Sequence, residues 1–174
     1  MSTGADNTFG LTRACSKVER LLGRALVGLM SFMVVDVTWQ VASRFVFRAP
    51  SSFTEELAGF LLIWIGLLGA AYGIRTRAHL GIPILVEKLG GPWRKGTEIL
   101  AHGLVLLFAL STMVGGGIWL VLLAFRLDQT SAAMGICMGY VYLALPLSGA
   151  LIVLFSLESI DGVVRRGTPL RGQA

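Results

Sequence analysis

Few side chains in this 174-residue chain have the types and positions that chemistry at a protein site needs. Asp36 follows the apolar residues Met33, Val34 and Val35, in a stretch suited to crossing a membrane. A carboxylate in the middle of such a span costs at least about 2.5 kcal/mol, so we expect Asp36 to face protein or water. Gln40 lies one helical turn later on the same face. Three interpretations stay open: a polar contact to another helix, an ion ligand, or a helix shifted so that Asp36 lies nearer water.

Other polar pairs indicate structural roles. Glu55 and Glu56 stand at the start of an apolar stretch, where acidic side chains favour the positive end of a helix dipole. Adjacent carboxylates point in different directions on a helix, which is unfavourable for shared acid–base work. Glu98 and His102 are four residues apart and can meet on one helix face. Neither pair has the further ligands that a metal site requires, so we expect no catalytic group, cofactor or metal.

The elements that position these residues are membrane spans. Of the residues, 55% are hydrophobic and only 14% are charged, with a mean hydropathy of +0.74, whereas soluble domains carry about 25% charged residues. Four continuous apolar stretches are long enough to cross the bilayer as helices, at about 25–47, 53–74, 99–125 and 138–157. None alternates as a barrel strand would. The predicted fold is an all-α integral membrane domain with four transmembrane helices, covering residues 1–174.

The distribution of lysine and arginine predicts the orientation. Twelve of the 15 basic residues lie in the N-terminal segment, the loop between the second and third spans, and the tail. By the positive-inside rule these three segments are cytoplasmic. The basic residues are spread along membrane borders without a continuous basic face, which argues against nucleic acid as a partner. Cys15 and Cys137 then lie near opposite faces and cannot form a disulfide within the chain.

Short segments between the spans predict contacts with lipid. Apolar residues at helical spacing predict an interfacial amphipathic helix at about 82–89. A similar pattern before Ala25 predicts a surface helix leading into the first span. Trp93, Arg94 and Lys95 follow as an expected anchor in the lipid headgroup region. Within the spans, Pro146 is expected to kink the fourth helix.

Glycines mark places where helices can approach one another closely. Gly66, Gly69 and Gly73, with Ala70, give the second span a smooth stripe. Gly115, Gly116 and Gly117 lie in the middle of the third span, where they likewise allow another helix to approach. These residues predict tight helix packing and carry no information on substrate.

A family resemblance rests on residues 44–79. It is carried by Arg44 with Phe45-Val46-Phe47, by Phe53-Thr54-Glu55-Glu56-Leu57, and by Trp64, Gly69-Ala70-Ala71, Arg75 and His79. In order and spacing these resemble the signature of the small membrane subunit of tripartite ATP-independent periplasmic (TRAP) transporters, the DctQ-like family. Length, the four spans and the cytoplasmic N-terminus also agree with that family.

The resemblance implies a role in a sodium-coupled transporter of the bacterial inner membrane. The small subunit pairs with a large multi-span subunit that carries the substrate and sodium sites and moves as an elevator. A periplasmic binding protein delivers the substrate, typically an organic acid. This chain is then the static scaffold, and membrane phospholipid is a further partner.

The same resemblance selects candidate interface or structural residues. Arg44, Glu55 and Glu56 are expected near the periplasmic border, where they pair with one another or contact the partners. Arg75 and His79 are expected at the cytoplasmic end of the second span, near the helix carbonyls or a phospholipid headgroup. Trp64 is the remaining family position.

Two alternative functions stay open on the sequence. A stand-alone channel or exporter would assemble as a homo-oligomer through the glycine stripe of the second span. A four-helix redox enzyme would need paired cysteines on one face, and the chain has one cysteine near each face.

Overall fold

The computed structural model describes residues 3–46, 51–76 and 92–166 of the chain, with side chains for 15–46, 51–76 and 100–160. The helices, in chain order, are α1 (Thr3–Phe45), α2 (Ser52–Thr76), α4 (Pro92–Phe108), η1 (Ala109–Gly116), α5 (Gly117–Arg126), α6 (Met138–Tyr142) and α7 (Ala144–Arg166). The predicted interfacial helix at 82–89 and His79 lie outside the described residues.

Four helical segments within the described ranges are long and apolar enough to cross a membrane. They are Cys15–Phe45, Ser52–Thr76, Leu100–Arg126 and Met138–Ile160. Each overlaps one of the spans predicted from the sequence, which confirms a four-helix integral membrane fold.

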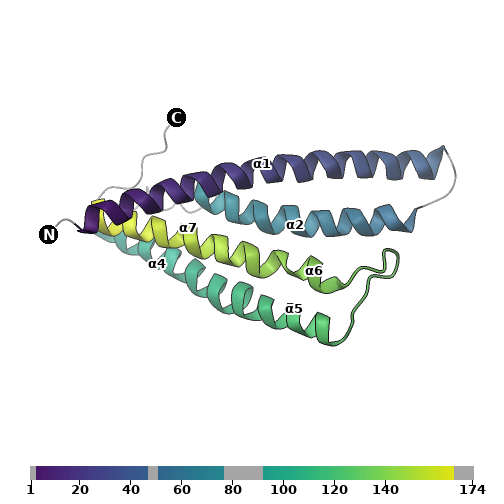
Figure 1. The fold of residues 1–174 in the computed structure, drawn as a ribbon. Helices are drawn as coiled ribbons and strands as arrows, with labels where there is room; N and C mark the ends of the chain where they lie inside the picture. Colours follow the sequence, from purple (N-terminus) through teal and green to yellow (C-terminus); the bar gives the residue numbers. More distant parts are fainter. Residues whose placement is uncertain (1–2, 47–50, 77–91, 167–174) are drawn as a thin grey trace.

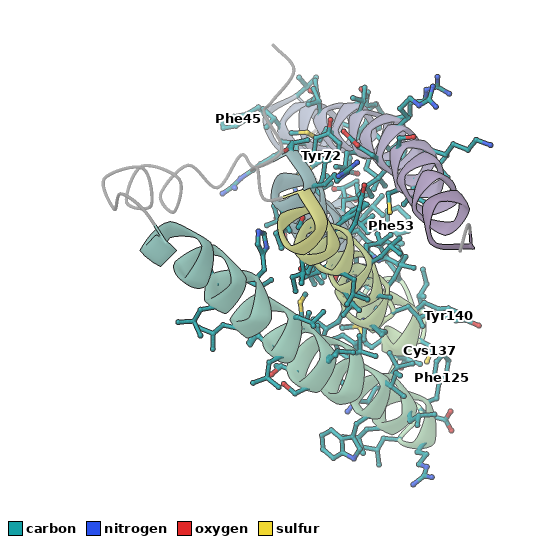
Figure 2. The ribbon with its side chains drawn as sticks, turned by 90° about the vertical axis from the view of Figure 1, so that its left-hand side faces the viewer. Phe45, Phe53, Tyr72, Phe125, Cys137 and Tyr140 are labelled. Atoms are coloured by element: carbon teal, nitrogen blue, oxygen red, sulfur yellow. The ribbon has the colours of Figure 1, made fainter. Side chains whose placement is uncertain are left out.

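The four spans stand in one row rather than in a closed bundle (Figure 1). Helix α1 packs on α2, α2 packs on α7, and α7 packs on the α4–η1–α5 helix. In the described part of the chain, neither α1 nor α2 packs against α4, η1 or α5. Viewed along the helices, α1 and α4 lie on opposite sides of α7 (Figure 2). The helices run side by side, so their termini lie on two opposite sides of the row. We call the side where α1 begins and α7 ends the N-terminal side, and the side where α1 ends and α2 begins the hairpin side.

A repeat of buried residues explains the packing of α1. Buried or half-buried side chains recur every seven residues, and a second set lies between them: Cys15, Leu22, Leu29, Asp36 and Ser43, with Leu26, Met33 and Gln40. This spacing is that of a left-handed helix pair. The repeat is apolar toward the N-terminal side and polar toward the hairpin side. The main apolar core accordingly forms on the N-terminal side, in one cluster of buried residues that includes Leu22 and Leu26 of α1 together with Leu68, Met113 and Phe155.

The third and fourth spans approach each other through glycines. A Cβ atom on Gly149 would lie 2.7 Å from Cβ of Met113, and one on Gly117 would lie 2.9 Å from Cδ of Pro146. Helix η1 is a π-helix that ends at Gly116, within the glycine run of the third span, and α5 continues from Gly117 without a break. The fourth span turns at Leu143, before α7 begins. Pro146 has no N–H to donate to the carbonyl of Tyr142, which explains the interruption at this point.

Candidate functional site

Arg75 joins three helices at the N-terminal side. Its Nε donates a hydrogen bond to Oε2 of Glu19 on α1 at 3.1 Å. Its Nη1 lies 3.1 Å from Oε2 of Glu158 on α7, an ion pair without good hydrogen-bond alignment. The Glu158 side chain is only 8% exposed, and the guanidinium carbon lies 5.9 Å from the centre of the Phe155 ring. The arrangement therefore gives Arg75 two protein carboxylates as partners and ties α1, α2 and α7 together.

Glu56 makes a second link, at the hairpin side. The backbone N–H groups of Ala133 and Met134 each donate to its Oε2 at 2.9 Å, and that of Ala132 donates to Oε1 at 3.2 Å. These three amides belong to the loop between α5 and α6. Charge-assisted hydrogen bonds of this kind are stronger than neutral ones. Glu56 therefore fastens that loop to the first turns of α2.

Arg44 and Glu55 lie nearby but are arranged differently. Both line a small cavity of about 110 Å³ between the end of α1 and the start of α2, together with Gln40, Val41, Phe45 and Ser51. Among the described side chains, no ion pair joins Arg44 to Glu55 or Glu56. The structure thus separates the two adjacent glutamates: Glu56 holds the loop, and Glu55 is exposed at this cavity.

Asp36 is buried in the row between the two links. It is 7% exposed, on the face of α1 that carries the buried heptad positions. Its Oδ2 has no hydrogen-bond partner among the described residues. Gln40 lies on the same face one turn toward the hairpin side, where it lines the cavity. Asp36 is thus a buried polar group with one carboxylate oxygen unpaired among the described residues.

Replacing Asp36 with leucine is expected to raise the melting temperature of the isolated chain in detergent. The change removes a carboxylate whose burial in a span costs at least about 2.5 kcal/mol, and leucine has a similar length. Asp36→Asn, which keeps the polar shape, is expected to have a smaller effect. Thermal unfolding followed by circular dichroism measures both variants. If both variants melt earlier than the wild type, Asp36 has a stabilising contact that this account misses.

The remaining family positions are placed less completely. Trp64 is half-buried and packs against the main core, so it contributes to packing within the chain. Trp93, Arg94 and Lys95 lie in the first turn of α4, and their side chains are outside the described set. Cys15 is buried in α1, whereas Cys137 precedes α6 on the hairpin side, and both are free thiols. In the described ranges, no three histidine, cysteine or acidic side chains gather as they would around a metal ion.

Two partners in these links escaped sequence reasoning. Glu19 was one charge within a basic segment, and Glu158 stood just beyond the predicted end of the fourth span. The signal available was an acidic residue adjoining an apolar span, which favours a buried ion pair. The amides that bind Glu56 are backbone groups and leave no mark in the sequence.

The apolar helices, joined by polar links on the N-terminal side and on the hairpin side, define a multi-pass helical membrane protein. The family model described as "Tripartite ATP-independent periplasmic transporters, DctQ component" matches residues 33–166. The chain belongs to this family, as the resemblance over residues 44–79 predicted.

Individual relatives agree with the family match. The chain is 33% identical over 117 residues to the C4-dicarboxylate TRAP transporter small permease protein DctQ of Rhodobacter capsulatus, covering 66% of this chain and 50% of that protein. It is 26% identical over 160 residues to the sialic acid TRAP transporter small permease protein SiaQ of Vibrio cholerae, covering 89% and 86%. It is also 27% identical over 146 residues to the isethionate TRAP transporter permease protein DctMQ of Oleidesulfovibrio alaskensis, covering 80% of this chain but only 23% of that longer protein.

Proposed function

We propose that this chain is the small permease subunit of a TRAP transporter and forms a static frame for a large multi-span transport subunit. The observation that carries the proposal is the open row of four spans. In the most apolar window of the first span only 17% of residues are buried, and even in the fourth the share is 39%. A row with two open faces leaves a broad surface on which a partner's helices can pack.

One face of α2 is well suited to such packing. At Gly59, Gly66 and Gly69, no described atom beyond the adjoining helix backbone lies within 4 Å of where a Cβ would stand, and Leu62 beside them is 58% exposed. Small residues let helix backbones approach closely in lipid. The internal interfaces use other glycines, Gly117 and Gly149, which leaves this α2 stripe available to a partner.

The proposed orientation follows the basic residues. The N-terminal side, with most of the lysines and arginines, lies in the cytoplasm, and the hairpin side lies in the periplasm of a bacterium with this transporter in its inner membrane. Glu56 and the cavity at Arg44 are then periplasmic, and the Arg75 ion pairs are cytoplasmic.

The proposed substrates are organic acids. The relatives named above are described as transporters of C4-dicarboxylates, sialic acid and isethionate, all of which are acids. Sodium coupling is part of the proposal through the family resemblance. Substrate and sodium would bind to the large subunit, and a periplasmic binding protein would deliver the substrate.

Co-purification tests the pairing. The chain, tagged and expressed together with its chromosomal neighbours, is expected to elute in a stoichiometric complex with a much larger multi-span permease. The matched control is the chain expressed alone under the same conditions. If the chain does not co-elute with the permease and instead forms a stable, conducting homo-oligomer, this result would support a stand-alone channel.

Gly66→Leu is expected to lower the yield of that complex by about tenfold or more, equivalent to at least about 1.4 kcal/mol of association free energy. The leucine would fill space that a partner helix needs, and its Cβ would have no described neighbour from another helix within 4 Å. The melting temperature of the isolated variant should match the wild type. Gly28→Leu, at an equally open position on α1, serves as the control. Unchanged co-purification of Gly66→Leu would remove the α2 stripe from the interface.

A further inference from the structure

The loop at residues 127–137 has a defined shape although it lies outside the spans. It joins α5 to α6, and it is longer than most connections of about two to eight residues between neighbouring helices. Thr130 and Cys137 form an antiparallel bridge. On either side of it, the N–H of Ser131 donates a hydrogen bond to the carbonyl oxygen of Ile136 at 2.8 Å, and the N–H of Met138 donates one to the carbonyl oxygen of Gln129 at 2.8 Å. The loop is thus a small hairpin-like structure.

Its backbone also adopts two conformations that most residues avoid. Asp128 has φ of 46° and Gly135 has φ of 64°, both in the left-handed region. Asp128 is not a glycine, so this conformation carries a steric cost. The loop keeps its shape because other contacts determine it.

Glu56 supplies the strongest of these contacts from outside the loop. Its carboxylate accepts hydrogen bonds from three successive amides, those of Ala132, Ala133 and Met134. The hydroxyl oxygen of Ser131 accepts a further bond from the N–H of Met134 at 3.2 Å. Neighbouring Glu55 is exposed and makes no such contact in the described structure. One of two adjacent carboxylates is therefore dedicated to holding the loop.

What the loop presents outward is suited to a protein. Leu127 is 60% exposed and Ile136 is 39% exposed, and Ala132 and Ala133 are exposed between them. Tyr140, at the start of α6, is 58% exposed and packs edge-on against Phe125, with ring centres 5.5 Å apart (Figure 2). A surface fixed before binding loses less conformational entropy when a partner docks.

We propose that loop 127–137 is a docking surface for the soluble substrate-binding protein, and that Glu56 is the positioning residue that holds it in its binding shape. This inference rests on the proposed function and orientation, which put the loop in the periplasm. The spans end at Arg126 and resume at Met138, so the loop lies where a soluble protein can reach it. The family is tripartite, which supplies a third component for such a surface.

The test uses the complex of this chain with its large subunit in lipid nanodiscs. In Glu56→Gln, the amide NH₂ replaces one acceptor oxygen and faces backbone donors. We expect hydrogen exchange at the amides of residues 132–134 to accelerate by about tenfold, and the Kd for the purified binding protein to rise by at least about fivefold. Glu55→Gln removes the same charge at the next residue, and it is expected to leave hydrogen exchange at the amides of residues 132–134 unchanged, because these amides bind Glu56.

A second variant addresses the surface itself. Ala133→Arg places a large side chain on the exposed loop while keeping the backbone N–H that binds Glu56. This variant is expected to raise the Kd for the binding protein, while hydrogen exchange at the amides of residues 132–134 stays at the wild-type rate. Unchanged Kd values for both Glu56→Gln and Ala133→Arg would overturn the inference, as would an equal acceleration of hydrogen exchange at residues 132–134 by Glu55→Gln. Failure of the wild-type chain to form the complex at all would refute the proposed function, a separate and distinguishable result.

Discussion

Replacing Arg75 with methionine is expected to destabilise the chain by about 3–5 kcal/mol, the largest effect that the structure predicts for one side chain. The guanidinium holds the carboxylates of Glu19 and Glu158, and Glu158 is nearly buried. Without Arg75 that carboxylate would remain buried among the helices without its cation. Unfolding in detergent, followed by circular dichroism, should show a lower melting temperature. The yield of the variant in membranes should also fall.

A double variant distinguishes a lost ion pair from a simple packing defect. Arg75→Met combined with Glu158→Met removes both charges, and much of the lost stability is expected to return because no buried charge is left unpaired. Glu19 is 31% exposed, so Glu19→Gln should cost less than Arg75→Met. A double variant no more stable than Arg75→Met would show that charge burial is not the cause.

The second large effect is expected at Gly149. A Cβ there would lie 2.7 Å from Cβ of Met113 and 3.2 Å from its backbone carbonyl carbon, and neither is the end of a flexible side chain. Helix α7 and helix η1 would have to move apart. Gly149→Ala is therefore expected to destabilise by about 1–3 kcal/mol, although alanine favours a helix over glycine by up to about 1 kcal/mol. The same unfolding measurement applies.

Gly116→Ala is the matched control in the third span. In the described part of the chain, no atom beyond the adjoining helix backbone lies within 4 Å of where its Cβ would stand. The helix preference of alanine should then make this variant as stable as the wild type or slightly more stable. Equal melting temperatures for Gly149→Ala and Gly116→Ala would mean that the close approach of α7 and η1 is not a determinant of stability.

The spans were predictable because lipid imposes a length and a composition on them. The predicted ranges agree with the helices to within a few residues at most ends. The chief difference is α1, which continues unbroken from Thr3 to Phe45, whereas the sequence suggested a surface helix leading into a separate span. No proline occurs before Phe45, so no residue of that stretch breaks the helix. Single glycines such as Gly10 and Gly23 weaken a helix without ending it.

The row arrangement and the polar links could not be predicted from the same patterns. Hydropathy does not say which spans are neighbours, and the partners of Glu56 are 76 to 78 residues away in the sequence. Arg75 reaches Glu19 across 56 residues. The sequence predicted an ion pair or a partner contact for Glu56, and helix carbonyls or a phospholipid headgroup for Arg75. Only the packing of the helices and the loop assigns the partners found here.

Reconstituted uptake tests whether this chain is an indispensable frame of a binding-protein-dependent transporter. Proteoliposomes would contain the large subunit with or without this chain, the binding protein outside, and an inward sodium gradient. Accumulation of one acid from a panel of C4-dicarboxylates, sialic acid and isethionate is expected only when the chain is present. Equal uptake by the large subunit alone would show that transport does not require this chain.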